Sequence, residues 1–368
     1  MFGNSTAYKP AGNPAFPGRI AIIVNPASVS KDLFHSADRL LEKYGTEKIL
    51  RITWPEDFVT ERKKLIATIV DLAEEKDIKI LILNQAMPGS MEAIDKLRET
   101  RDDIFIILCS IHEPESEIAL RADLIFRPNE PGMGLAMVKQ AKKQGAKVFV
   151  HYSFPRHMAK AAWLNKKKVI NDTCEAEGMQ FVDVTALDPM GVEGVEGAGR
   201  FIIEDVSRQV ANFGENTAFF CTNCQLQKSL IKAVIDNRAI YPQSCCPSPY
   251  HGFPEALDIK SDGGQNDLNF VISEASRIAA EKNMSDRLST WPVSASMMFA
   301  NAGAEYAILW LNGKVDRDHL DDRVLEDCMN AYIKEEVGEG VKVEMSSFEE
   351  NGTVYNNLKL VLMSYLDL

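Results

Sequence analysis

The sequence predicts an α/β protein with two doubly wound, mainly parallel sheets, and three observations carry this prediction. The chain has 368 residues, more than a single hydrophobic core usually serves, so two domains are expected. Short apolar runs alternate with segments of helical periodicity along most of the chain, which is typical of parallel sheets. Two prolines and a glycine within 127–132 interrupt this alternation, and it then starts again. We therefore expect one Rossmann-like domain on each side of that break.

The first half of the pattern opens with a buried strand at 19–24 (RIAIIV), which ends in the turn Asn25-Pro26. Apolar residues at helical spacing predict a helix over 33–44, with Ser30 as a candidate N-cap and Gly45 after the last turn. The alternation continues with expected strands at 48–53, 79–83, 104–110 and, at a sheet edge, 123–126, and with expected helices at 61–76 and 90–100.

The second half repeats the same alternation. Expected strands lie at 147–152, 180–185 and 217–222, and expected helices at 134–144, 158–177, 201–213 and 225–237. Two connections stand out by their length: 188–199 is rich in glycine and acidic residues, and 241–253 is rich in proline, cysteine and serine. Loops of this length often carry function.

The remaining chain predicts three helices and a hairpin. The helices are expected at 267–282, 295–311 and 321–334, and strands at 341–348 and 353–362 are joined through Asn351-Gly352, a strong hairpin signal. Small residues surround Gly303 in the second of these helices. The expected division is a flexible leader at 1–18, a first domain of 19–128 plus about 285–318, and a second domain of 129–284 plus about 319–368.

Composition excludes several classes of protein. A net charge of −12 opposes direct nucleic-acid binding, which needs a basic surface. No apolar run reaches the roughly 18 residues of a membrane span. Seven cysteines do not form a disulfide framework, which favours the cytoplasm. The leader fits that location, and it equally fits the alternative, an exported lipoprotein whose signal has been removed.

Polar residues that follow the expected strands are the candidate ligand contacts, because open parallel sheets bind ligands at the carboxyl ends of their strands. They are Asn25, Ser28, Thr53, Trp54, Asn84, Gln85, Ser110, His151, Tyr152, Ser153, Asp188, Thr222 and Asn223, together with Trp291 beside an expected interdomain linker. Amides, hydroxyls and aromatic rings suit binding, and no matched acid and base is present among them. We therefore assign no catalytic residue and no cofactor. The competing interpretation is that these residues only form turns, and that Trp291 only packs against a domain face.

Four cysteines leave a metal or redox role open. Cys221 and Cys224 have CxxC spacing, and Cys245 and Cys246 are adjacent. Four thiolates can hold zinc. An adjacent pair is awkward for tetrahedral coordination, however, and buried cysteine is common as a small apolar residue. We therefore assign no metal ligand from the sequence.

Three segments carry a resemblance to a known fold. They are 122–152 (ADLIFRPNEPGMGLAMVKQAKKQGAKVFVHY), 216–237 (NTAFFCTNCQLQKSLIKAVIDN) and the helix at 296–313. In this order they resemble the type 1 periplasmic-binding-protein fold, which substrate-binding lipoproteins share with the effector-binding cores of lac-repressor-type regulators. The resemblance extends from Arg19 over nearly all of the chain and rests on the order of elements.

The resemblance implies two domains that hinge on several linkers and close on a ligand in the cleft between them. We therefore expect a solute-binding or sensor protein for a small polar molecule, with a transporter or regulatory protein as partner. The alternative is the effector-binding core of a transcriptional regulator that lacks its own DNA-binding domain. A thiol or zinc-dependent enzyme built on the four cysteines is the third hypothesis.

Overall fold

The computed structural model describes residues 15–57, 61–261 and 267–368. Most of the predicted leader, residues 1–14, lies outside the described residues. The chain divides into two compact units, each with its own sheet. The first unit contains residues 15–128 and 295–362, and the second contains residues 129–261, 267–294 and 363–368. No helix among the described residues is both long and apolar enough to cross a bilayer.

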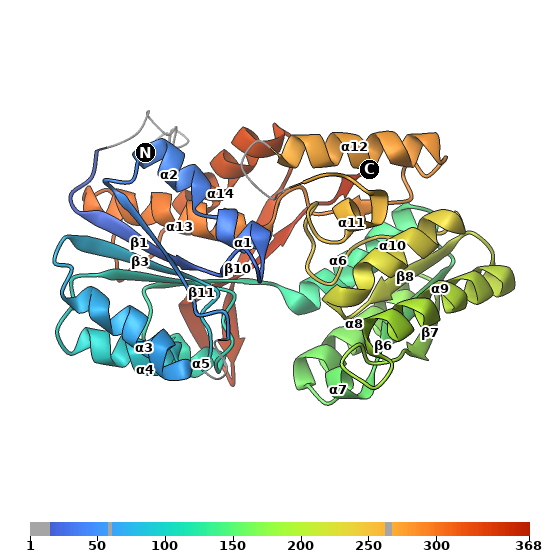
Figure 1. Ribbon diagram of the computed structural model, residues 1–368, viewed down its shortest axis with the longest axis horizontal. Helices are drawn as coiled ribbons and strands as arrows, with labels where there is room; N and C mark the ends of the chain where they lie inside the picture. The colour runs from blue at the N-terminus through green and yellow to red at the C-terminus, as the bar shows by residue number, and fades with distance from the viewer. Residues whose placement is uncertain (1–14, 58–60, 262–266) are drawn as a thin grey trace, which may run out of the picture. The chain divides into compact units, whose positions relative to one another are not determined.

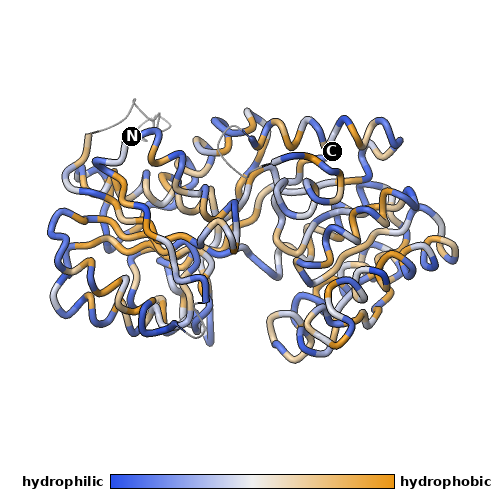
Figure 2. The backbone as a smooth tube through the Cα atoms, viewed as in Figure 1, coloured by the Kyte–Doolittle hydropathy of each residue, from blue (hydrophilic) through white to orange (hydrophobic). Residues whose placement is uncertain are grey.

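The first unit is built on a seven-stranded sheet in the order β10-β11-β5-β4-β3-β1-β2. Its strands are β1 (Arg19–Val24), β2 (Ile49–Thr53), β3 (Ile78–Asn84), β4 (Phe105–Cys109), β5 (Leu124–Pro128), β10 (Val343–Glu350) and β11 (Thr353–Met363). β1 lies parallel between β2 and β3, with Ile20 opposite Ile49 and Ile80. The central strands are buried and strongly apolar along their length, as Figure 2 shows.

The C-terminal hairpin corrects two predictions. β11 pairs in parallel with β5, with Leu358 opposite Ile125. β5 is therefore an interior strand, not the predicted edge, and residues 319–362 belong to the first unit instead of the second. The turn between β10 and β11 has left-handed backbone at both Asn351 (φ 51°) and Gly352 (φ 79°), as the Asn-Gly signal predicts.

Helices cover both faces of this sheet. They are α1 (Lys31–His35), α2 (Asp38–Tyr44), α3 (Arg62–Val70), the 3₁₀ turn η1 (Asp71–Ala73), α4 (Ser90–Arg98), α5 (Glu115–Ile118), α13 (Ala295–Leu311) and α14 (Asp322–Val337). α3 and α4 pack on one face and α13 on the other (Figure 1). α13 approaches closely because Gly303 has no side chain: a Cβ there would lie 3.1 Å from Ile107 and 3.2 Å from Phe126.

The helix predicted over 33–44 is broken in the structure. α1 ends at His35 and α2 starts at Asp38. The hydroxyl of Ser36 donates a hydrogen bond to the carbonyl oxygen of Leu33 over 2.6 Å. Serine competes in this way with the helical backbone pattern. The buried Ser36 is then held by side chains from β3 and α13.

The second unit has a smaller parallel sheet in the order β7-β6-β8. Its strands are β6 (Val148–Ser153), β7 (Gln180–Thr185) and β8 (Thr217–Cys221), and β9 (Ser289–Thr290) pairs antiparallel with β12 (Leu366–Asp367). Parallel bridges from Ala218 to Ile240 and from Tyr241 to Leu288 continue the pairing beyond β8. The chain therefore leaves β8 and the segment 240–241 in the same direction.

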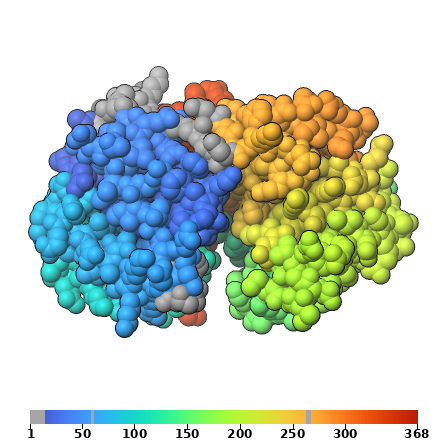
Figure 3. Space-filling model, in the orientation of Figure 1, coloured from blue at the N-terminus to red at the C-terminus, as the bar shows by residue number. Residues whose placement is uncertain are grey.

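Helices also enclose the second sheet on both faces. They are α6 (Glu130–Lys143), α7 (Pro155–Met158), α8 (Ala161–Ala176), α9 (Gly194–Phe213), the 3₁₀ turn η2 (Cys224–Leu226), α10 (Gln227–Asp236), α11 (Phe253–Leu257) and α12 (Leu268–Glu281). Residues of α6 and α8 share a core with Phe149 and Phe220, and those of α9 and α10 share one with Val150 and Phe219. The outer side of α12 forms part of the visible surface of this unit, orange in Figure 3.

Two helix starts in the second unit lie earlier than predicted. α6 begins at Glu130 because Asn129 caps it: its Oδ1 accepts a hydrogen bond from the Gly132 backbone over 3.0 Å. Proline is tolerated in the first turn of a helix. α9 begins at Gly194, so the predicted loop at 188–199 is shorter than expected.

Candidate functional site

The carboxyl ends of β1, β3 and β4 lie side by side because these neighbouring strands are parallel. Asn25 follows β1, and its Nδ2 donates a hydrogen bond over 3.0 Å to Oε1 of Gln85, which follows β3. The buried Trp54 follows β2, and its Nε1 donates to the carbonyl oxygen of Gln85 over 3.2 Å. The structure thus brings together three predicted ligand residues from three strands.

Two side-chain amide oxygens at this edge are buried without a hydrogen-bond partner among the described residues. They are Oδ1 of Asn25 and Oδ1 of Asn84. Asn84 is the last residue of β3, and its Nδ2 donates to Oγ of Ser36 over 2.6 Å. An unpaired buried acceptor costs about 1–3 kcal/mol, so proteins normally provide a partner. Each of these oxygens therefore keeps an unused capacity to accept a hydrogen bond.

The backbone is strained at two of these strand ends. Gln85 (φ 78°) and Ser110 (φ 53°) have left-handed conformations that side-chain-bearing residues rarely adopt. Each is fixed by its neighbour: the Gln85 amide donates to Cys109, and the Ser110 amide donates to Phe126, both over 3.0 Å. Residues held in such conformations cluster at functional sites.

The other predicted residues of the first unit lie closer to the surface. Ser28 and Thr53 are exposed, and Oγ of Ser28 donates to Oε1 of Glu56 over 2.8 Å. A small pocket between α2, α13 and α14 includes Arg39 and Glu305 in its lining, and none of the predicted ligand residues lines it. The strand ends remain the better candidate site in this unit.

Three predicted residues of the second unit are the last three residues of β6. His151, Tyr152 and Ser153 are all buried. The hydroxyl of Tyr152 donates to Oδ2 of Asp205 over 2.9 Å, and burial together with this carboxylate raises the pKa of Tyr152 far above its usual value. The ring of His151 packs on the opposite face of the sheet, between Phe181 and Phe220. These side chains contribute to the cores, and a ligand role for them stays a prediction.

Polar groups meet after β6 and β8, at the carboxyl end of the second sheet. Nδ1 of His157 lies 2.9 Å from Oγ1 of the predicted residue Thr222, and the imidazole stacks on Trp163 at 5.2 Å. Arg156 donates two hydrogen bonds of 2.8 Å to the predicted residue Asp188, which lowers the pKa of that carboxyl to about 2. Arg156 and His157 are not among the predicted ligand residues, although both closely follow β6.

Asn223 and Trp291, two further predicted ligand residues, also lie in the second unit. Oδ1 of Asn223 accepts a hydrogen bond from the Gln225 backbone over 2.9 Å and so caps η2. Trp291 is fully buried, and its Nε1 has no hydrogen-bond partner among the described residues. The sequence allows two interpretations of Trp291, ligand contact and packing against a domain face. Its burial is compatible with both.

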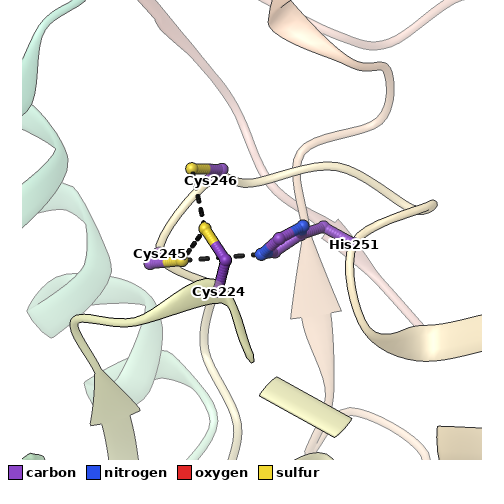
Figure 4. A group of neighbouring side chains, drawn as sticks. All are labelled: Cys224, Cys245, Cys246 and His251. Atoms are coloured by element: carbon purple, nitrogen blue, oxygen red, sulfur yellow. Dashed lines mark hydrogen bonds between the residues drawn. The ribbon is translucent and has the colours of Figure 1, made fainter. Parts of the chain in front are cut away.

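A cluster of thiols and one imidazole lies beside this edge (Figure 4). Sγ of Cys224 lies 3.3 Å from Sγ of Cys245 and 3.8 Å from Sγ of Cys246, and Sγ of Cys245 lies 3.5 Å from Nε2 of His251. Cys221 does not join them, because its side chain belongs to the hydrophobic core of the second unit. The four-cysteine set considered from the sequence is therefore wrong for Cys221. The fourth residue of the group is His251. We call Cys224, Cys245, Cys246 and His251 the thiol–imidazole cluster.

Comparison with known proteins identifies the family. A family model described as "Protein of unknown function (DUF3798)" matches residues 19–289. The chain belongs to this family. Two proteins of Treponema pallidum (strain Nichols), each described as "Uncharacterized protein", are similar to this DUF3798 chain. One is 31% identical over 179 residues, 47% of this chain and 81% of the relative. The other is 30% identical over 166 residues, 45% of this chain and 76% of the relative.

Solved structures are similar to the DUF3798 chain in fold. A "Putative transcriptional regulator" from Clostridium difficile 630 has a TM-score of 0.85 at 20% identity, covering 96% of this chain and 99% of that one. A sugar ABC transporter protein from Actinomyces odontolyticus has a TM-score of 0.53 at 10% identity, covering 81% and 84%. A periplasmic ribose ABC transporter protein from Conexibacter woesei has 0.51 at 12%, covering 83% and 91%. The predicted type 1 periplasmic-binding-protein fold is confirmed.

Proposed function

We propose that this DUF3798 chain binds a small polar solute at the carboxyl ends of its parallel strands, as a binding protein without catalysis. The observation that carries this proposal is the pair of buried amide oxygens of Asn25 and Asn84 at neighbouring strand ends, for which the described part of the chain provides no hydrogen-bond partner. The fold supports it, because the similar structures include proteins described as a sugar ABC transporter and a periplasmic ribose ABC transporter.

The groups at these edges favour a neutral solute with several hydroxyl groups. Oδ1 of Asn25 and Oδ1 of Asn84 accept hydrogen bonds, which sugar hydroxyls can donate. In the second unit, Arg156 offers a charged donor whose position is fixed by Asp188. Few rotatable groups need ordering, because Asn25 and Arg156 are already hydrogen-bonded.

An effector-binding regulator core is the second candidate function, and the similarity to the protein described as a "Putative transcriptional regulator" favours it. Both functions use the same solute site, so solute affinity does not distinguish them. Their partners do. A transport protein works with a membrane transporter, with its export signal encoded upstream, whereas a regulator core works with a DNA-binding element.

A thermal-shift screen of the full chain tests the proposal. Sugars, polyols, nucleosides, amino acids and small acids are each added at millimolar concentration, and hits are titrated by calorimetry. A solute at about 100 times its Kd should stabilise the folded chain by about 2.7 kcal/mol, visible as a higher Tm. A screen in which no small polar solute raises the Tm, or in which every hit binds equally well to Asn25→Ala, would contradict the proposal.

A further inference from the structure

The thiol–imidazole cluster joins two segments of the second unit. Cys224 opens η2 directly after β8, whereas Cys245, Cys246 and His251 lie in the loop at 241–253. β8 and the segment before this loop are bridged in parallel, so both chain segments emerge at the same end of the sheet. Figure 4 shows the three sulfurs and the imidazole turned toward one another. All four ligand atoms lie within 4.8 Å of each other.

Three distances within the cluster match those of a tetrahedral zinc site. Zinc bonds of about 2.3 Å to sulfur and about 2.0–2.1 Å to nitrogen separate two sulfurs by about 3.7 Å, and a sulfur from a nitrogen by about 3.5 Å. The cluster has sulfur–sulfur distances of 3.3 Å and 3.8 Å from Cys224, and a sulfur–nitrogen distance of 3.5 Å at His251. The side chains therefore need to move by only a few tenths of an ångström along these edges.

Neighbouring contacts hold the ligands in place before any metal binds. The buried Gln227 donates hydrogen bonds to the carbonyl oxygens of Cys221 and Asn223, and its Oε1 accepts one from Tyr241 over 2.5 Å. Gln227 thus connects the two ligand-bearing segments. Gly252, next to His251, packs so tightly that a Cβ there would lie 2.8 Å from Gln227. This packing fixes the loop on α10 beside His251.

We propose that Cys224, Cys245, Cys246 and His251 form a zinc site that fastens the loop at 241–253 to the end of β8. Three thiolates and one imidazole are a structural zinc ligand set, and they fill the tetrahedral coordination without an open position for catalysis. Binding releases the protons of the cysteine thiols, so the bound group carries one negative charge. Cys224 and Cys246 are exposed and leave a path for the metal, and Cys245 is buried.

Metal analysis and cobalt substitution of the full chain test this site. The protein, purified under reducing conditions and dialysed, should hold about one zinc per chain. After exchange for Co²⁺ it should show the absorption of tetrahedral cobalt with thiolate charge transfer. After dialysis against a weak chelator, the zinc content of Cys224→Ser and of His251→Ala should be about tenfold lower than that of the unmodified protein. Octahedral cobalt, iron or copper in place of zinc, or less than about one tenth equivalent of zinc, would overturn the proposal.

Two matched controls separate this cluster from other cysteines. Cys221→Ala removes the other member of the CxxC pair and should leave zinc content unchanged, because Cys221 lies in the core. Cys174→Ala removes a buried thiol from the core on the other face of the sheet and should do the same. Loss of zinc in a well-folded Cys221→Ala protein, with retention in Cys224→Ser, would assign the metal to a different site.

Alkylation of the unmodified protein keeps the test independent of variants that fail to fold. Zinc should protect Cys224 and Cys246 from iodoacetamide, and a strong chelator should remove that protection, as read by mass spectrometry of the peptides. Equal labelling with and without zinc would overturn the site. So would a Cys224–Cys245 disulfide in the purified protein, if the reduced form fails to take up zinc.

Discussion

Nδ1 of His151 lies 2.9 Å from Oδ1 of Asp183 on the neighbouring strand, inside the second sheet. His151 is almost completely buried, and this burial lowers its pKa by more than the carboxylate of Asp183 raises it. The lowered pKa favours the neutral imidazole in the folded protein, and Nδ1 then donates its hydrogen bond to the carboxylate of Asp183. This arrangement makes the stability of the second unit dependent on pH.

Stability should fall as the pH drops below about 6.5, where His151 gains a proton in the unfolded chain but not in the folded one. The expected loss reaches about 1.4 kcal/mol per pH unit until the lowered pKa of the folded state is reached. His151→Gln should lack this component. Urea unfolding of both proteins at pH 7.5 and 5.5 measures it. The exposed variant His319→Gln is the control, and an identical pH dependence in the wild type and His151→Gln would rule the explanation out.

Asn25→Ala should weaken solute binding and reduce stability. The substitution removes the hydrogen bond to Gln85 and one of the unpaired acceptors. We expect a loss of about 1 kcal/mol in unfolding free energy and about a tenfold higher Kd for the solute found by screening. Asn357→Ala is the matched control, because that amide donates to backbone carbonyls of Ala119 and Ala122 near the amino end of β5. Calorimetry should show unchanged affinity for Asn357→Ala.

Two helix glycines should respond in opposite directions to alanine. Gly303→Ala places a Cβ 3.1 Å from Ile107 and 3.2 Å from Phe126, so these side chains or α13 must move by a few tenths of an ångström. Stability should then fall by about 1–2 kcal/mol. Gly134→Ala places a Cβ at 3.4 Å from its neighbours, an ordinary contact, and should gain up to about 1 kcal/mol from helix propensity. Chemical unfolding of both variants measures the difference. Equal effects at the two positions would show that α13 does not depend on this close approach.

Removal of the proposed zinc should loosen the loop at 241–253. This loop contains little regular structure of its own, so a metal that fixes three of its side chains would restrict its opening. Limited proteolysis with and without a chelator should give faster cleavage within 241–253 in the metal-free protein. Cleavage in the exposed turn at Asn351-Gly352 of the first unit serves as the internal reference and should not change.

Local patterns predicted most elements well where one signal dominates. The strands at 19–24 and 180–185 and the helix at 295–311 have the predicted bounds. The predictions failed where the bounds of a helix depend on one side chain, or where the pairing of a strand depends on a distant segment. Ser36 interrupts a helix by bonding to its own backbone, and Asn129 starts one early by capping it. The pairing of β11 with β5 joins residues far apart in the sequence, which periodicity does not reveal.

The residues of the candidate sites were also predicted correctly in part and missed in part. Asn25, Trp54 and Gln85 come together as expected, because parallel strands bring their carboxyl ends to one edge. His251 was missed because its partners are found only when the loop at 241–253 is seen to lie against η2. CxxC spacing then pointed to Cys221, whose side chain turns into the core at the end of β8. Chain spacing alone does not reveal which face of a strand a residue occupies when the strand is buried on both sides.

Residues 353–368 complete two different structures. β11 lies beside β5 in the first sheet, and the short β12, only a few residues later, pairs with β9 in the second unit. A ribosome makes this stretch after every other described segment, so neither unit can finish folding before residues 353–368 have been made. A product released by stalling near residue 350 would present β5 as an open, apolar strand edge, which is a template for aggregation.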